Sequence, residues 1–270
     1  MLQRITHALQ HRLSRFAAYL ASRQWGKLTT WGIQCYIRYY HIDMTIAEQP
    51  LPSAYASFND FFTRALKSSV RPIDSHVNSL ISPVDGTLLQ LNAIESSTII
   101  IKNQSYPLEE LLCSDVLAKK YQDAFILQAY LSPKDYHRIH MPFAGTLKSC
   151  VFIPGALSSV NPNKKLGCGY ITKNRRMIAE FENHLGDFVF IMVGALNVGD
   201  IQTAWGDSFD HSPKLQNTIS QAITLNKGEP LGQFLLGSAI VMLTRAKVVA
   251  THKDIESSLK WGERLLTLEQ

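Results

Sequence analysis

The sequence contains no apolar run long enough to cross a membrane as a helix. About 18 uninterrupted apolar residues are needed for that. Basic residues break every candidate stretch near the N-terminus, namely Arg12, Arg15, Arg23 and Lys27. The apolar segment from Phe16 to Ser22 is too short and too closely flanked by arginine for a secretory signal. Together with a mean hydropathy of -0.04, these features predict a protein without a membrane-spanning helix.

Cysteine is scarce, and its spacing forms no motif. The four cysteines, Cys35, Cys113, Cys150 and Cys168, include no CxxC pair, so neither a zinc site nor a disulfide framework is indicated. We expect buried thiols in a reducing cytoplasm. The GxSxG elbow of the α/β-hydrolases is also missing. The glycine-bearing stretch from 193 to 200 lacks the Lys-Ser/Thr of a phosphate-binding loop.

Acidic residues are missing from the first 42 positions, which hold six basic residues before Asp43. Apolar residues there recur in steps of three and four, as on one face of a helix. They are Leu2, Ile5, Leu9, Leu13, Phe16 and Leu20. The segment from Leu28 to Tyr40 adds aromatic residues of the kind that settle at headgroup depth. Two interpretations stay open: a basic amphipathic anchor on an anionic membrane, or a helical pair packed on the protein's own core.

The rest of the sequence is rich in strand-like runs separated by glycine and proline. They cover residues 98–102, 124–131, 145–154, 177–181, 188–194, 201–205 and 240–249. Helices are expected only over Phe58 to Leu66 and Leu108 to Tyr121, so the strands should pair mainly antiparallel. We therefore expect an α+β fold, with an N-terminal amphipathic, membrane-associating helical region over 1–46 and a β-rich catalytic body over 47–270.

The dipeptide Gly237-Ser238 places a hydroxyl beside an unhindered carbonyl. If Ser238 Oγ adds to the Gly237 carbonyl, the amide becomes an ester. β-Elimination then leaves dehydroalanine, which hydrolyses to a pyruvoyl group at the head of a new chain. The simpler alternative is a glycine at a bulge before a strand, followed by a solvated serine.

Three separated segments carry a recognisable pattern. They are Phe58-Asn-Asp-Phe-Phe-Thr-Arg64 with Val70-Arg-Pro-Ile-Asp74 and Ser82-Pro-Val-Asp-Gly86, then Tyr130-Leu-Ser-Pro-Lys-Asp-Tyr-His-Arg-Ile-His-Met-Pro142, and finally Lys227-Gly-Glu-Pro-Leu-Gly-Gln-Phe-Leu-Leu-Gly-Ser-Ala-Ile240. In order and spacing they resemble the bacterial phosphatidylserine decarboxylase family, whose processing motif is KGxxxGxFxxGST. The resemblance covers nearly the whole chain. It implies self-cleavage between Gly237 and Ser238. It also implies conversion of phosphatidylserine into phosphatidylethanolamine and CO2 through a Schiff base on a pyruvoyl cofactor derived from Ser238.

The resemblance also implies roles for four side chains. Asp85, His140 and Ser238 would form a charge relay for self-cleavage, since a serine hydroxyl needs a base and histidine suits that task near neutral pH. His137 would handle the substrate or deliver a proton. From the residues alone, a turn explains Asp85 better than catalysis does, and only the match to the family's SPxDG segment favours the catalytic role. The two histidines would share a face in a helix and point oppositely in a strand. Because no further ligand beyond Asp135 accompanies them, no metal is expected.

Two departures from the family pattern stand out. Ala239 occupies a position where the family has threonine or serine, and the loop 161–176 keeps only Asn174-Arg175 of its motif. An uncleaved, inactive relative that binds lipid or a partner is therefore an alternative. A lipid hydrolase in which Ser238 survives as serine is another.

The resemblance implies several partners. They are phosphatidylserine, an anionic membrane surface, and the protein's own chains 1–237 and 238–270 as a heterodimer. A homodimer is left open, and no nucleic acid is expected. The implied location is the cytoplasmic face of the cell membrane, as a peripheral protein.

Overall fold

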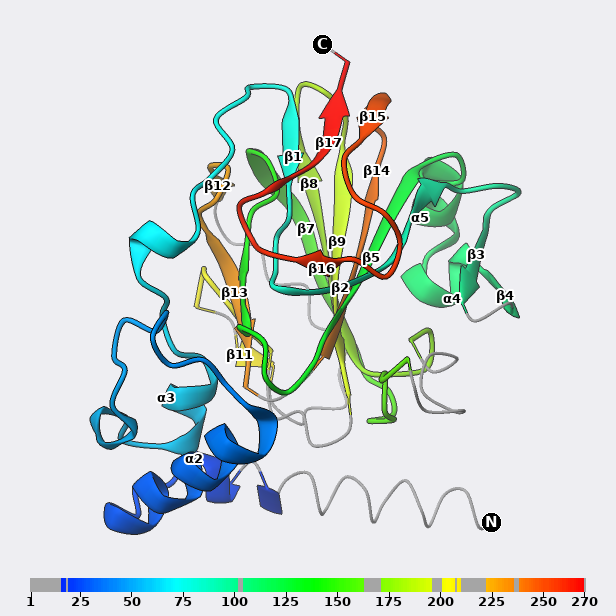
Figure 1. Cartoon of the computed structure of the whole chain (residues 1–270). Helices are drawn as coiled ribbons and strands as arrows, with labels where there is room; N and C mark the ends of the chain where they lie inside the picture. The colour runs from blue at the N-terminus through cyan, green and yellow to red at the C-terminus, as the bar shows by residue number, and fades with distance from the viewer. Residues whose placement is uncertain are drawn as a thin grey trace, which may run out of the picture.

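Antiparallel strands make up most of the folded chain (Figure 1). The computed structural model describes residues 16–17, 19–101, 104–162, 171–195, 201–206, 208–209, 222–235 and 238–269. Every ladder between its named strands is antiparallel. The expected α+β class with mainly antiparallel strands is therefore confirmed.

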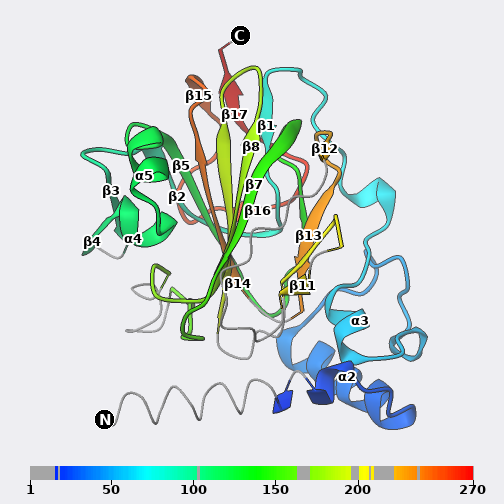
Figure 2. The same ribbon diagram turned by 180° about the vertical axis from the view of Figure 1, so that it is seen from behind.

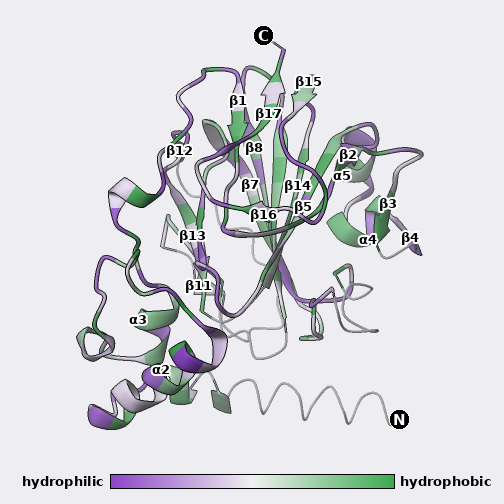
Figure 3. Cartoon of the chain, viewed as in Figure 1, coloured by the Kyte–Doolittle hydropathy of each residue, from purple (hydrophilic) through white to green (hydrophobic). Residues whose placement is uncertain are grey.

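The largest sheet has eight strands, and β14 lies near its middle. Their order is β12 (Thr224–Leu225), β7 (Gly145–Ile153), β8 (Arg176–Glu182), β9 (Phe188–Gly194), β14 (Ser238–Thr244), β5 (Phe125–Leu131), β2 (Gly86–Ala93) and β16 (Ser258–Leu259). All seven residues of β9 are buried, as are six of the seven in β8. Burial of one such side chain contributes about 1.5–3 kcal/mol. The core therefore surrounds β14 and its neighbours, where Figure 3 shows apolar residues concentrated.

Three smaller sheets complete the body. A four-stranded sheet has the order β11 (Ser208–Phe209), β10 (Ile201–Thr203), β13 (Pro230–Phe234) and β6 (Arg138–His140). A three-stranded sheet has the order β1 (Ser79–Ile81), β17 (Arg264–Leu268) and β15 (Val248–Thr251), and a hairpin joins β3 (Thr98–Ile101) to β4 (Gln104–Pro107). The four-stranded sheet joins the Lys227–Ile240 segment to the Tyr130–Pro142 segment, because β13 pairs with β6.

Helices are short and few among the described residues. After helical residues at 16–17 and 19–22, they are α2 (Lys27–Tyr40), α3 (Phe58–Phe62), α4 (Leu108–Leu112) and α5 (Asp115–Lys120), with 3-10 turns at Pro52–Ala54 and Ser68–Val70. The single helix expected over Leu108 to Tyr121 is wrong. Cys113 takes a left-handed conformation with φ 49°, and the Ser114 side chain then accepts a hydrogen bond from the Leu117 N–H and starts a new helix.

A second, smaller core holds α2 and α3 together. It is formed by Ile33, Ile42, Tyr55 and Phe61. Figure 2, from behind, shows α2 and α3 on one side of the body and the α4, α5 and β3–β4 segment on the other. The boundary expected at residue 46 stays a prediction, since residues on both sides of it share this small core. The amphipathic pattern that begins at Leu2 lies largely outside the described residues.

Exposure of the cysteines corrects one expectation. Cys150 is buried as expected, but Cys35 and Cys113 are exposed. Cys35 lies on the outer side of α2, and Cys113 follows the last residue of α4. Cys168 lies outside the described residues. Within the described ranges, no helix combines the length and apolar character needed to cross a membrane.

Candidate functional site

Ser238 is the first residue of β14. Its Cα faces Leu131 of β5 on one side and Gly194 of β9 on the other. The predicted cleavage point therefore lies where the chain enters the middle of the largest sheet. Gly237 and the side chain of Ser238 lie outside the described residues. The surroundings of the bond are consequently known from the strands and loops that flank it.

The ladder between β13 and β6 connects the processing segment to both histidines. Its register pairs Pro230 with His140, and the Phe234 N–H donates to the His137 carbonyl at 3.1 Å. His137 thus lies at the end of β13 that leads directly toward Ser238, and His140 lies at the far end of that strand. The two paired segments lie about 90 residues apart in the sequence. The register between β13 and β6 could therefore not be predicted from the sequence.

His137 is fully buried and stacks on Phe62 of α3, with ring centroids 4.0 Å apart. Its Nε2–H donates to the Ser132 carbonyl at 3.1 Å, since a carbonyl only accepts. Ser132 follows Leu131, the Cα partner of Ser238. Burial, and next the charge of Arg64, lower the pKa of His137 to about 3. At neutral pH the ring is therefore neutral, and its buried Nδ1 lone pair has no partner among the described residues.

His140 is also buried, but both of its ring nitrogens are engaged. Its Nδ1–H donates to the Gly228 carbonyl at 2.9 Å, and the Tyr136 hydroxyl donates to Nε2 at 2.9 Å. The indole of Trp261 stacks on the imidazole, with centroids 3.8 Å apart and planes 5° apart. Burial lowers the pKa of His140 to about 4, although the Gly228 hydrogen bond and the charge of Asp85 oppose the shift. This ring is therefore neutral too.

A glycine is required where the chain turns toward His140. Gly228 has φ 81°, and a Cβ there would lie 2.4 Å from Ile73 Cδ1. The turn is closed by Glu229, whose carboxylate accepts from the Asn226 backbone at 2.7 Å and from its side chain at 3.0 Å. This local geometry directs the Gly228 carbonyl at the imidazole and fixes its tautomer.

Asp85 is held by an arginine rather than by a histidine. Arg71 donates through Nε to Oδ1 at 3.0 Å and through Nη2 to Oδ2, and the backbone N–H of Trp261 donates to Oδ1 at 2.9 Å. Both side chains of this ion pair are buried. Among the described residues, no hydrogen bond joins Asp85 to His140. In this arrangement Asp85 acts on His140 through its charge alone.

The structure adds residues that the sequence did not single out. Arg71 and Tyr136 belong to the quoted segments, so their neighbourhood was visible although their partners were not. Phe62 was likewise part of the first segment. Trp261 carried no signal, because it lies some 120 residues beyond His140 and no motif surrounds it. It nevertheless contacts both Asp85 and His140.

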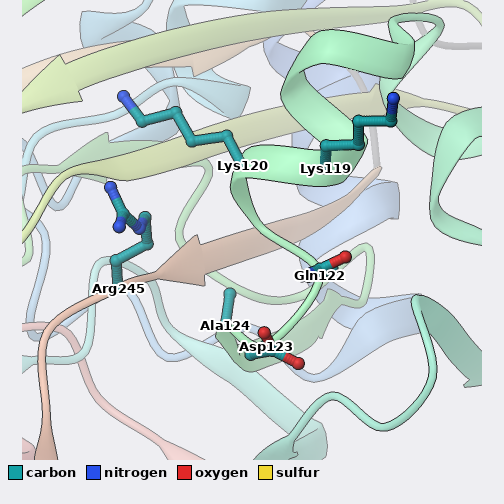
Figure 4. A pocket seen from close by; sticks show the side chains of 6 residues that line it. All are labelled: Lys119, Lys120, Gln122, Asp123, Ala124 and Arg245. Atoms are coloured by element: carbon teal, nitrogen blue, oxygen red, sulfur yellow. The ribbon is translucent and has the colours of Figure 1, made fainter.

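A cavity of about 310 Å³ lies at the opposite end of β14 from Ser238. It is lined by Lys119, Lys120, Gln122, Asp123, Ala124 and Arg245 (Figure 4). Arg245 follows the last residue of β14, and Ala124 precedes the first residue of β5. Lys120 already binds Glu180 at 2.7 Å, and it also binds Asp187. The cavity is therefore separate from the predicted cleavage point.

Fold and site together describe an antiparallel α+β protein with two buried, neutral histidines near the strand that Ser238 begins. Comparison with known proteins gives the family. The family model described as phosphatidylserine decarboxylase matches residues 58–267. The chain belongs to the phosphatidylserine decarboxylase family.

Relatives match over almost their entire length. The chain is 42% identical over 255 residues to the phosphatidylserine decarboxylase proenzyme of Shewanella putrefaciens (strain CN-32 / ATCC BAA-453), covering 91% of this chain and 88% of that one. A proenzyme of the same name from Shewanella sp. (strain MR-4) is also 42% identical, covering 91% and 87%. That of Shewanella baltica (strain OS155 / ATCC BAA-1091) is 41% identical over 275 residues, covering 96% and 94%.

Proposed function

We propose that this protein is a self-processing decarboxylase that converts phosphatidylserine into phosphatidylethanolamine and CO2. Membership of the family supports the reaction, and the word proenzyme in the relatives' names supports maturation by processing. The structural observation that carries the proposal is the place of Ser238. Ser238 begins β14 and pairs with Leu131 of β5 and Gly194 of β9. The loop from Ser132 to His137 continues from Leu131, and the strand β6 that follows this loop pairs with β13.

In the proposed self-cleavage, Ser238 Oγ attacks the Gly237 carbonyl and His140 accepts the hydroxyl proton. The neutral state of His140 supports this role, because an imidazole that is already protonated cannot act as a base. The Tyr136 hydroxyl occupies Nε2 in the described arrangement. The proton therefore reaches His140 either through that hydroxyl or after this hydrogen bond opens. Asp85 stabilises the resulting imidazolium by its negative charge, and it binds the ring directly only after releasing Arg71.

The chain fits a pyruvoyl group at position 238. Residues 239–244 pair on both sides with β5 and β9, so a chain that starts at 238 keeps its place without residue 237. When present, that group supplies the electron-withdrawing carbonyl that an amino-acid decarboxylation requires. His137 lies on the loop beside this position, with a neutral ring and a free Nδ1. We assign it to substrate handling and proton delivery.

Intact-mass analysis of the purified protein tests the proposal directly. We expect two fragments, 1–237 and 238–270, and the small one should be blocked at its amino end by pyruvate. Ser238→Ala should stay uncleaved and inactive. Full decarboxylase activity in an intact 30.3 kDa chain would refute the mechanism. An intact, inactive wild-type chain would instead support the uncleaved relative that Ala239 raised, and an unmodified, labelled Ser238 would support a hydrolase.

We further propose that the protein binds an anionic membrane as a peripheral protein on its cytoplasmic face. Support comes from exposed apolar side chains of the N-terminal region, among them Trp25, Leu28, Trp31 and Tyr39, whose exposed fractions lie between 52% and 76%. Basic residues of the same region, such as Lys27 and Arg38, suit contact with anionic lipid. A heterodimer of the two processed chains follows from the cleavage, and a homodimer stays a prediction.

A further inference from the structure

Arg64 is a buried cation without a counter-ion. Its exposed fraction is 3%, and no carboxylate of the described residues lies within the 4.0 Å of a salt bridge. Its Nη2 donates to the carbonyls of Lys134 at 3.2 Å and Asp135 at 3.5 Å. Its Nε and Nη1 are buried and have no hydrogen-bond partner among those residues. Two donor nitrogens of a charged group are thus left unsatisfied.

Two other buried arginines, Arg71 and Arg176, have acceptors where Arg64 has none. Arg71 binds the Asp85 carboxylate through two nitrogens. Arg176 donates to three carbonyls, those of Leu111, Asn174 and Glu110, each at 2.7 Å. Buried polar groups are nearly always hydrogen-bonded, and an exception calls for a functional reason or a missing partner. Unlike Arg71 and Arg176, Arg64 has two donor nitrogens without an acceptor among the described residues.

The acids nearest to Arg64 are already engaged. Asp85 is bound by Arg71, and the Asp135 carboxylate accepts from the Ser132 N–H and hydroxyl, both at 2.7 Å. The hydroxyls of Tyr36 and Tyr55 donate to the carbonyls of Pro133 and Gln49, and burial raises the pKa of both groups, which therefore stay neutral. The cation–π contact with Phe61 at 5.4 Å offers no acceptor for Nε or Nη1.

Arg64 lies beside the reaction site. It follows α3, whose Phe62 stacks on His137, and its Nη2 contacts the loop that continues from Leu131. Leu131 is the strand partner of Ser238. The Arg64 charge also helps to lower the pKa of His137. An anion bound here would thus be held within the same small region as residue 238 and His137.

We propose that Arg64 binds the phosphodiester of the phospholipid substrate. This rests on the proposed function, which supplies a substrate with two anionic groups, a phosphodiester and a carboxylate. The carboxylate loses its charge as CO2 departs, so an arginine clamped on it would favour the ground state over the transition state. The phosphodiester keeps its charge throughout, and arginine is well suited to phosphate oxygens.

Access to the free nitrogens requires a local movement, because both are covered. Arg64 follows α3, and its Nη2 contacts the Ser132–His137 loop through the Lys134 and Asp135 carbonyls. The Tyr36 hydroxyl ties α2, whose exposed aromatic side chains we assign to the membrane, to the same loop at Pro133. Entry of a headgroup between α3 and this loop would bring the phosphodiester to Arg64 and the amino-acid end toward residue 238.

The test compares wild-type protein with Arg64→Gln and Arg64→Lys, with Arg245→Gln as a matched control at the far end of β14. Intact mass and a thermal melt first establish cleavage and folding. Kinetics on dihexanoyl phosphatidylserine then give KM and kcat, and dihexanoyl phosphatidylethanolamine gives an inhibition constant and, by calorimetry, a Kd. This product retains the phosphodiester and lacks the carboxylate.

We expect Arg64→Gln to mature normally. It should raise KM, the inhibition constant and the Kd by a common factor of about 10–100, while kcat stays within about threefold of the wild-type value. This is the pattern expected when an interaction equally strong in the ground state and the transition state is lost. Arg64→Lys should lose less, and Arg245→Gln should match wild type. Unchanged affinity for the product would overturn the proposal and point to the carboxylate. Failure of both variants to fold, or to cleave while folded, would give Arg64 a structural or processing role. An inactive wild type would instead refute the proposed function, and the calorimetric comparison would still decide the subsite.

Discussion

Two histidines only three residues apart have entirely different surroundings. His137 packs on Phe62, and its Nδ1 has no partner among the described residues. His140 lies against Trp261 with both ring nitrogens bonded. Spacing left their relative orientation open, because a helical turn would have placed both on one face. His140 belongs to β6 and His137 precedes it, so the backbone is extended there. These different surroundings are compatible with the separate roles that we propose for the two histidines.

Substitutions should therefore separate maturation from turnover. We expect His140→Ala and Asp85→Asn to slow self-cleavage by about 10²–10⁴-fold, the usual contribution of a positioned base. His137→Ala should mature and then decarboxylate about 10²-fold more slowly or worse. A gel time course measures the first effect, and release of CO2 per mole of cleaved protein measures the second.

Because both histidines are buried, each variant needs a thermal melt beside the wild type as a folding control. Tyr136→Phe is an informative companion. It removes the hydroxyl that occupies Nε2 of His140 and leaves the ring in place. The opposite pattern, with His137→Ala uncleaved and His140→Ala cleaved but inactive, would show that the two roles must be exchanged.

Helix α2 presents two unlike faces. Ile33 is fully buried, and the Tyr36 hydroxyl donates to the Pro133 carbonyl at 3.2 Å, which ties the helix to the loop before His137. On the other side Leu28, Trp31 and Tyr39 are exposed by 66%, 65% and 76%. The two interpretations of the sequence are thus compatible, since one face packs on the protein and the other is free for lipid.

Charge substitutions on α2 test membrane binding. We expect Trp31→Glu to weaken binding to vesicles of phosphatidylcholine and phosphatidylglycerol by at least about tenfold, because it removes an aromatic ring suited to headgroup depth. Gln34→Glu adds the same charge to the same helix at an exposed polar position, and it should weaken binding only by the electrostatic part, about 1 kcal/mol. Co-sedimentation measures both. Equal losses would mean that Trp31 does not enter the lipid surface.

Elements with a strong local pattern were predictable from the sequence, and those that depend on one turn were not. The apolar run Phe188–Gly194 forms β9 with the expected bounds, and α2 begins one residue before the expected Leu28. The run from Ile240 to Val249 instead forms parts of two strands, which separate after Thr244. The site residues lay within recognisable motifs, but their partners depend on long-range pairing. The ion pair of Asp85 with Arg71 and the stack of Trp261 on His140 had no local signature.

The 33 residues from 238 to 270 contribute strands to sheets whose other strands come from residues 1–237. They supply β14 between β5 and β9, β16 beside β2, and β17 beside β1. Polar contacts also join the two parts of the chain, such as the ion pair of Arg264 with Asp74 at 2.8 Å. Cleavage before Ser238 would therefore break one bond without removing any strand from its sheet.

The two fragments should accordingly behave as one folded unit after cleavage. Ile240, Val241, Met242 and Leu243 are all buried, and burial of four such side chains contributes about 6–12 kcal/mol. We expect both fragments to co-elute in gel filtration at the volume of uncleaved Ser238→Ala, and to unfold in urea in a single transition. Separation of the small fragment under native conditions would contradict this. The small fragment also carries Trp261, which contacts both Asp85 and His140. Dissociation of this fragment would therefore disrupt the site. Activity and co-elution should disappear together as the urea concentration is raised.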